Sequence, residues 1–276
     1  MATRARELRT AARTALQRLR GWLARYPLSC NLCGCGVPAF LPLPANLLLE
    51  LDRAGFPRKL LLGSETLNVA HYLCPVCRAT DRDRLIGLFL SRVPDGSSSL
   101  PWPNMLDVAP SMPLRAYILR SRRFAYRSVD LTDPRADDRA DVQDLRLYDD
   151  ATFDCVLCSH VLEHVPDDRR ALRELRRVLR PSGWAVILAP VAVPLAGTRE
   201  DPTLLDPLER TKRFGQADHL RLYAKADLIA RIEGAGFSEV KQLDATFFGL
   251  KAFVRHGIAA PSVLYVASGL QAQPTR

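Results

Sequence analysis

Short apolar runs alternate with amphipathic segments from Leu85 toward the end of the chain. Such runs, bounded by polar or turn-forming residues, predict β-strands. The run WAVILA at 184–189 is apolar throughout, which is typical of a strand covered on both faces of a sheet. The predicted strands cover residues 103–109, 124–130, 153–158, 184–189, 237–243 and 263–267, and a further short strand ends at Asp141 and Val142.

Helical spacing of apolar residues marks two segments between these strands. Asp167 can cap the first helix, whose apolar stripe runs from Leu172 to Leu179, and the Pro-Ser-Gly sequence at 181–183 ends it. The second helix covers residues 225–233. Because strands and helices alternate, we expect an α/β fold with a doubly wound, mostly parallel sheet.

The first part of the chain predicts a separate basic helix. Leucine and alanine recur at three- and four-residue spacing across residues 4–24, with arginines on the remaining positions. The interpretation we favour is a helix that packs on the body of the protein by its leucine stripe. Association with a membrane surface and a transit segment are the alternatives.

Composition narrows the class of protein. The chain has 276 residues, is 47% hydrophobic and 25% charged, and has no apolar run of the length that a membrane helix needs, which argues against a disordered or a membrane-spanning protein. Its net charge is +9, but residues 1–26 hold seven arginines against one glutamate, so the rest is nearly balanced and offers no broad nucleic-acid surface. Seven cysteines without an apolar leader predict a reducing, cytoplasmic location.

Two Cys-x-x-Cys pairs predict a structural zinc site. Cys30 and Cys33 form the first pair, and Cys74 and Cys77 form the second. Each pair places two thiolates on one turn, which suits half of a tetrahedral site, with free thiols as the alternative. Cys35 is a spare. The pair Cys155-x-x-Cys158 falls on a predicted strand, where the two side chains point to opposite faces and cannot share a metal.

The segment His160-Val-Leu-Glu-His164 matches the pattern of inverted zinc proteases. That chemistry needs one long helix with both histidines on one face. Pro166 follows two residues later and a new helix is predicted from Asp167. We therefore expect a turn between strand and helix at this place.

Acidic residues end three successive predicted strands, at Asp107, Asp130 and Asp141. In an open α/β sheet, ligands bind beyond the carboxyl ends of the strands, and an acid after the second strand can accept hydrogen bonds from ribose hydroxyls. Asp is also common in turns. Pro110 stands where a phosphate-binding loop needs glycine, so the pattern favours a nucleoside without phosphates.

The run from Asp107 to Gly236 resembles the class I S-adenosylmethionine-dependent methyltransferases of the methyltransferase type 11 group, most closely in HVLEHVPDD and LRELRRVLRPSGW. The later run REDPTLLDPLERTKRFGQADHLRLY is similar to a subgroup in which a cysteine-knuckle module precedes the methyltransferase domain. The resemblance covers most of residues 28–268 and implies a seven-stranded Rossmann-like sheet. The domains that we expect are a basic helix at 1–26, a zinc module at 27–84, a methyltransferase domain at 85–270 and a tail at 271–276.

The resemblance also implies where S-adenosylmethionine binds. The acid that ends the first strand lies near the methionine part and the acid after the second strand holds the ribose. A pair after the third strand flanks the adenine, and the turn after the fourth strand adjoins the sulfonium. The glycine-rich turn of the family is replaced by Ala109-Pro110-Ser111. The implied cofactor residues are Asp107, Ala109, Asp130, Asp141, Val142, Ser159 and His160.

The segment FGQADHLRLY at 214–223 lacks apolar periodicity and, with Arg213, is dense in hydrogen-bonding groups, which predicts a loop over the site. We expect Glu200, Asp201 and Arg210 to belong to the same lid. A histidine is useful as a base near neutral pH, so His219 is the candidate general base, with its partner left open. A solvated surface loop is the alternative. The substrate-binding residues that we expect in this lid are Glu200, Asp201, Arg210, Arg213, Gln216, Asp218 and Arg221.

These features predict a methyltransferase that acts on a small molecule or a sugar-like hydroxyl. A second hypothesis makes RNA or protein the acceptor, with the cysteine module for recognition. It is less favoured because aromatic and basic residues do not interleave in that module. A third hypothesis is a non-catalytic binding protein that has lost cofactor affinity at the altered first turn.

Overall fold

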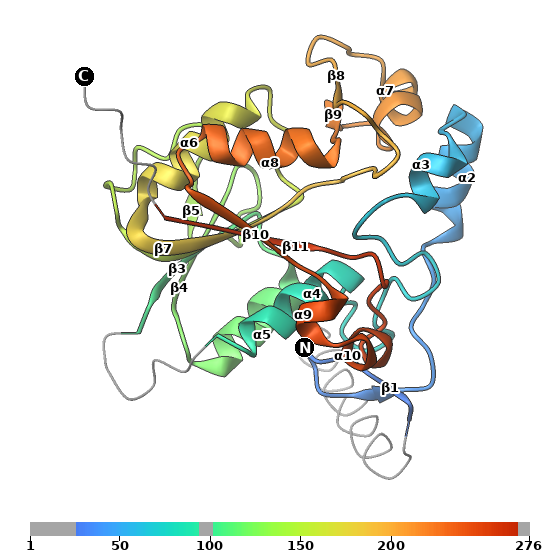
Figure 1. Cartoon of the computed structure of the whole chain (residues 1–276), viewed down its shortest axis with the longest axis horizontal. Coiled ribbons are helices and arrows are strands. Elements are labelled where there is room, and N and C mark those ends of the chain that lie inside the picture. Colours follow the sequence, from blue (N-terminus) through green and yellow to red (C-terminus); the bar gives the residue numbers. More distant parts are fainter. Residues whose placement is uncertain (1–25, 94–101, 270–276) are drawn as a thin grey trace, which may run out of the picture.

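The computed structural model describes residues 26–93 and 102–269 as an α/β protein (Figure 1). A seven-stranded sheet has the order β10-β11-β7-β6-β3-β4-β5. Within it only β11 runs against its neighbours. Helices α6 and α8 cover one face, and α4 and α5 cover the other. The doubly wound, mostly parallel sheet expected from the sequence is confirmed. The predicted helix at 4–24 and the tail at 271–276 lie outside the described residues.

The strands of the large sheet follow the apolar runs of the sequence closely, and most of their residues are buried. The described strands are β1 Leu28–Ser29, β2 Gly36–Val37, β3 Asn104–Val108, β4 Ala125–Asp130, β5 Asp138–Arg139, β6 Phe153–Ser159, β7 Leu179–Leu188, β8 Arg199–Glu200, β9 Arg221–Leu222, β10 Glu239–Leu243 and β11 Leu264–Ser268. The described helices are α2 Ala45–Ala54, α3 Arg58–Leu62, α4 Asp81–Leu90, α5 Met112–Ser121, α6 Asp168–Val178, α7 Pro207–Phe214, α8 Lys225–Gly234, α9 Ala245–Phe248 and α10 Leu250–Arg255.

Three local predictions were wrong. The third strand ends at Arg139, two residues before Asp141, because Asp141 already forms a turn. Helix α6 ends at Val178, and Leu179 is extended and pairs with Phe153, so the segment at 181–183 lies inside β7.

The loop predicted at 214–223 was the third error, since Phe214 ends helix α7 and Arg221–Leu222 form strand β9. The rest of α7 lies in the part of the chain expected to form the lid. Asp206 caps the helix by accepting from the N–H of Glu209, Pro207 occupies its first turn, and Gly215 ends it with φ +92°. These capping signals were present in the sequence. The helix is too short to show clear apolar periodicity.

The cysteine-rich part shares the main hydrophobic core, which contains Cys30, Leu32 and Cys74. Arg84 of α4 is fully buried and donates hydrogen bonds to the carbonyls of Ala79 and Gly257, as well as to others nearby. This guanidinium therefore ties the second cysteine turn to the segment that follows α10. Within the described residues, no helix combines the length and the apolar character that crossing a bilayer requires.

Candidate cofactor site, acceptor cavity and cysteine cluster

The acid at the tip of β3 is buried. Asp107 is 3% exposed, and its Oδ2 accepts a hydrogen bond of 2.9 Å from the hydroxyl of Tyr126 on β4. Burial raises the pKa of Asp107 to about 7. The ionised form of such a buried carboxyl group is stabilised most by a nearby positive charge, such as the ammonium of an amino acid.

The turn after β3 has a backbone conformation that glycine adopts most easily. Ala109 is exposed and has φ +51°. Its N–H donates to the carbonyl of Val129, which keeps the turn close to β4. Ser111 then caps α5 and donates from Oγ to Asp83 at 2.7 Å. The position that holds glycine in the resembled family thus keeps the left-handed conformation with alanine in it.

Two further acids lie at the same edge of the sheet. Asp130 ends β4, where its Oδ1 accepts from the backbone N–H groups of Thr132 and Asp133 at 2.7 and 2.8 Å. The N–H of Ala140 donates to the backbone carbonyl of Asp130, which brings the turn at Asp141 beside it. Val142 is buried next to this turn. The predicted nucleoside residues are therefore brought together at the tips of adjacent strands.

The turn after β6 holds an unusual pair of ionisable groups. His160 follows Ser159 with φ +57°, and its Nδ1 lies 2.9 Å from Oε1 of the fully buried Glu163. Burial, together with the nearby charge of Arg82, lowers the pKa of His160 to about 4. Although burial alone would raise it, attraction to His160 and the other histidines holds the pKa of Glu163 at about 2. The expected turn between strand and helix is confirmed.

His219 belongs to the same group of residues. Its ring is 3% exposed, its Nδ1 hydrogen-bonds the carbonyl of Phe214 at 3.2 Å, and its Nε2 lies 4.0 Å from Oε1 of Glu163. The ring of His164 meets it edge-on at 4.8 Å. The sequence left the partner of His219 open. Glu163 was visible only as part of a rejected protease motif, because nothing local indicates that residues 56 positions apart meet.

A mostly apolar cavity of about 100 Å³ adjoins this group. The polar side chains that line the cavity are Ser64, Thr66, Tyr72, Arg82, His160, Gln216 and His219. The other walls come from α2, α3, α7 and β9. The apolar side chains that line the cavity are Leu43, Leu47, Leu51, Phe56, Leu61, Leu67, Pro190, Val191, Phe214 and Leu222.

Most of the other predicted substrate residues do not line this cavity. Glu200 pairs with Arg221 at 3.3 Å and with Arg231 at 2.8 Å, and Asp201 pairs with Arg213 at 2.9 Å. Arg210 donates to the carbonyl of Leu204, and Asp218 contacts His164. Of the seven, the cavity is lined by Gln216 alone. The remainder form ion pairs or hydrogen bonds that join neighbouring segments.

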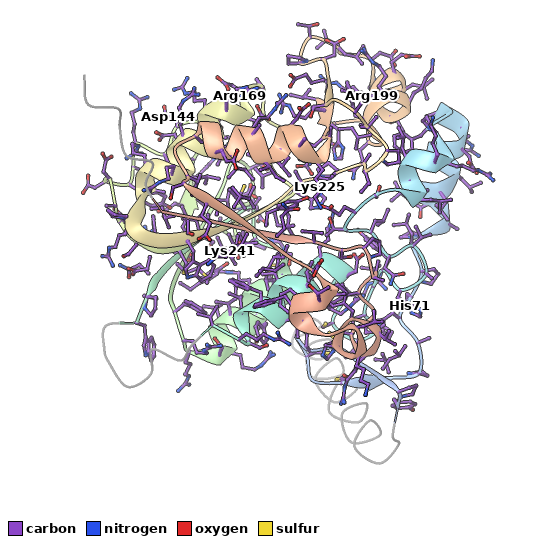
Figure 2. All side chains as sticks on the ribbon, viewed as in Figure 1. His71, Asp144, Arg169, Arg199, Lys225 and Lys241 are labelled. Carbon is purple, nitrogen blue, oxygen red and sulfur yellow. The ribbon has the colours of Figure 1, made fainter. Side chains whose placement is uncertain are left out.

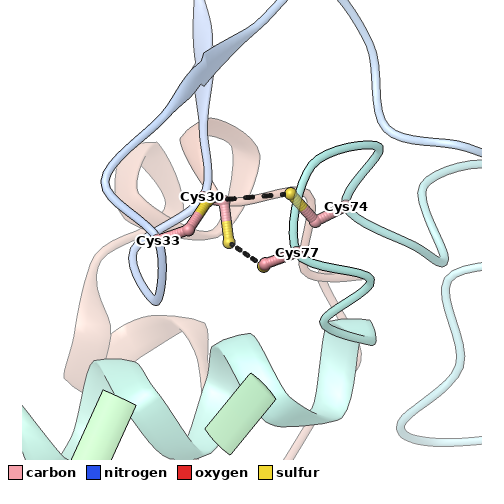
Figure 3. Close-up of side chains that lie close together, drawn as sticks. All are labelled: Cys30, Cys33, Cys74 and Cys77. Atoms are coloured by element: carbon pink, nitrogen blue, oxygen red, sulfur yellow. Dashed lines mark hydrogen bonds between the residues drawn. The ribbon is translucent and has the colours of Figure 1, made fainter. Parts of the chain in front are cut away.

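The four predicted zinc ligands meet in space (Figure 3). Sγ of Cys30 lies 3.7 Å from Sγ of Cys77, Sγ of Cys33 lies 3.9 Å from that of Cys74, and all four sulfurs lie within 4.8 Å of one another. Zn–S bonds of about 2.3 Å in a tetrahedron separate the sulfurs by about 3.8 Å. The group could therefore hold a metal ion.

Both cysteine turns have the same backbone design. The N–H of Gly34 donates to the carbonyl of Cys30, and the N–H of Arg78 donates to that of Cys74 in the same way. Gly34 and Arg78 both have positive φ, at +73° and +67°. Cys35 is buried with its Sγ directed to the carbonyl of Cys33, outside the four-sulfur group. Cys155 and Cys158 are buried core residues, as expected.

Comparison with known proteins agrees with the fold. The strand order describes an open, mostly parallel α/β sheet of the Rossmann-like type. Residues 123–187 match the family model described as "Methyltransferase domain". Residues 123–187 are therefore similar to a methyltransferase domain, and a four-cysteine group precedes them in the chain.

Individual relatives are distant. Thiol S-methyltransferase TMT1B of Mus musculus is 33% identical over 99 residues, which are 36% of this chain and 38% of that protein. Among solved structures, the [4+2]-cyclase SpnF is 17% identical with a TM-score of 0.46 and covers 84% of this chain and 100% of its own. A SAM-dependent methyltransferase from Archaeoglobus fulgidus is 15% identical with a TM-score of 0.44, over 69% of this chain and 94% of its own.

Proposed function

We propose that this protein transfers a methyl group from S-adenosylmethionine to a hydroxyl or thiol group of a small, mostly apolar molecule. The observation that carries the proposal is the mostly apolar cavity lined by Arg82 and by His160, which follows β6, the strand that pairs with β3 and its Asp107. An apolar wall favours a hydrophobic acceptor over a sugar, which would leave hydroxyls unpaired. The thiol methyltransferase among the relatives agrees with a thiol as one acceptor.

The cofactor would be held by the acids at the strand edge. Asp130 has an oxygen left for ribose hydroxyls after Oδ1 has bound two backbone N–H groups, and Asp107 can pair with the ammonium of the methionine part. Asp141 and Val142 would flank the adenine. When bound, the cofactor supplies a methyl group on a positively charged sulfur. An acceptor bound in the cavity would be positioned and partly shielded from water, which is most of what such a displacement needs.

The proton of the acceptor would go to Nε2 of His160. Because Nδ1 faces Glu163 at 2.9 Å, the proton of the neutral ring resides on Nδ1 and the lone pair on Nε2 is free. Glu163 then stabilises the imidazolium that forms, as the carboxylate does in other histidine pairs. Arg82 adds a positive charge near the developing oxyanion or thiolate. His219 lines the same cavity, so it orients the acceptor beside this pair.

Calorimetry with S-adenosylmethionine and its demethylated product tests the cofactor. Asp130→Asn removes the ribose acceptor, so we expect binding to weaken by about ten- to a hundredfold. Asp144→Asn is the matched control, because the Asp144 carboxylate, labelled in Figure 2, pairs with the exposed Arg146 at the surface. If wild-type protein binds neither nucleoside at about millimolar concentration, the proposed function is wrong.

A labelled-methyl screen over alkyl thiols, aryl thiols and phenols tests the reaction. For His160→Gln we expect a loss of about a hundredfold or more in transfer rate with cofactor binding retained, which is the usual contribution of a general base. His71→Gln, outside the cavity, is the control. Unchanged turnover in His160→Gln would remove the base. Cofactor binding without transfer to any of these acceptors would favour the non-catalytic alternative.

A further inference from the structure

Two histidines from separate segments meet at the buried carboxylate of Glu163. His164 comes from the turn after β6, and His219 comes from the segment between α7 and β9. The Nε2 atom of each ring lies 4.0 Å from Oε1 of Glu163. One ligand atom from each of the three residues fits within a span of 4.8 Å.

The hydrogen-bond partners leave both Nε2 atoms without a proton. Nδ1 of His219 bonds the carbonyl of Phe214 at 3.2 Å, and Nδ1 of His164 lies 3.2 Å from Oδ2 of Asp218. Each partner is an acceptor, so each Nδ1 carries the proton of the neutral ring. Each Nε2 therefore carries a lone pair 4.0 Å from Oε1 of Glu163, which is itself an acceptor.

If nothing lies between the Glu163 carboxylate and the rings of His164 and His219, this arrangement destabilises the folded protein. Glu163 is 0% exposed and His219 is 3% exposed. Nδ1 of His160 lies 2.9 Å from Oε1 of Glu163 but outside hydrogen-bond geometry, and among the described residues no donor serves Oε2 of Glu163 or Nε2 of His219. Buried acceptors without a donor lose free energy on folding, and lone pairs that face a carboxylate repel it. A cation between them satisfies all three groups at once.

We propose that Glu163, His164 and His219 bind a divalent transition-metal ion, at a second site distinct from the four cysteines. Two imidazole nitrogens and one carboxylate suit zinc and its neighbours better than calcium or magnesium. The carbonyl of Phe214 and the carboxylate of Asp218 supply the outer hydrogen bonds that histidine ligands of metals usually make.

Three protein ligands leave a coordination position open. His219 lines the apolar cavity, while the side chain of His164 is 35% exposed, so the ion has a path from solvent on one side and the cavity on the other. The ion would join the turn after β6 to the segment after α7, both of which line the cavity. This site does not depend on methyl transfer, and its test does not use activity.

Titration of the metal-free, reduced full-length protein with Co²⁺ and Zn²⁺ tests the site. Thiolate ligands give Co²⁺ charge-transfer absorption, whereas histidine and carboxylate ligands do not, so optical spectra separate the two sites. We expect one equivalent with charge-transfer absorption and a further equivalent without it. His164→Ala should weaken the second equivalent by about a hundredfold or more and leave the first unchanged. Asp218→Asn should weaken it by about tenfold, as loss of an outer hydrogen bond does.

His71→Ala is the matched control, since it removes a histidine that belongs to neither group. His164 is partly exposed, so its variant should fold, and circular dichroism checks this. The proposal is overturned if wild-type protein takes up only the thiolate-bound equivalent at about 1 mM Co²⁺, in which case a water bridges the three acceptors. It is equally overturned if the second equivalent binds His164→Ala as tightly as wild-type protein.

Discussion

Arg221 offers a sharp test of how the cavity wall is held. Its guanidinium is 1% exposed, and it donates to the carbonyls of Leu162, Val165 and Pro166 at 2.6, 2.5 and 2.9 Å. Its Nε also lies 3.3 Å from Glu200. These carbonyls belong to the turn that carries His160 and Glu163. Arg221 therefore fixes the turn after β6 onto β9.

Arg221→Lys keeps the charge but cannot reach the same three carbonyls, because an ammonium group is compact and not forked. Hydrogen bonds from a charged group contribute about 1.5–3 kcal/mol each. If the lysine replaces about one of the three carbonyl bonds, we expect a loss of about 4 kcal/mol in the free energy of unfolding. At about 2–4 °C per kcal/mol for a chain of this size, Tm falls by about 8–16 °C.

Thermal and urea unfolding followed by circular dichroism measure this loss. Arg213→Ala is the control, because Arg213 pairs with Asp201 at the surface, where an ion pair contributes about 1 kcal/mol or less. From the sequence, both Arg221 and Arg213 were predicted to bind the substrate. If Arg221→Lys were as stable as Arg213→Ala and differed from wild type only in acceptor KM, the structural role argued here would be refuted.

Two further predictions concern the metal and pH. Cys74→Ser, or a strong chelator under reducing conditions, should release about one zinc per chain and lower Tm. Cys35→Ser should keep the metal, because Cys35 lies outside the four-sulfur group. Elemental analysis measures the zinc, and equal zinc loss in both variants would contradict the assignment. Burial raises the pKa of Asp107 in the folded state to about 7. The contribution of Asp107 to the free energy of unfolding is therefore fully present below about pH 4 and is lost as the pH rises toward 7, by up to about 4 kcal/mol. Urea unfolding of Asp107→Asn should therefore show a flatter decline of stability over this range, and a profile parallel to wild type would count against the buried acid.

Much of the fold could be predicted from local sequence. Buried parallel strands need continuous apolar runs, and β6 and β7 were recognisable for that reason. Helix α6 was recognisable because Asp167 caps it and one face is apolar. The four cysteine ligands were predictable from spacing, since each pair acts through its own turn and only the meeting of the two turns needed the structure.

A smaller part of the candidate site than of the fold could be predicted from local sequence. Local sequence located Asp107 and Asp130, because apolar runs end there, but it extended the third strand to Asp141, two residues beyond its end. Long-range contacts alone bring His219 to Glu163, hold the turn after β6 through Arg221, and form the cavity at His160. The reason is physical. Apolar periodicity shows which face of a segment is buried, but not which other segments it contacts. The burial, tautomer and charge of a side chain depend on the groups that distant segments bring next to it.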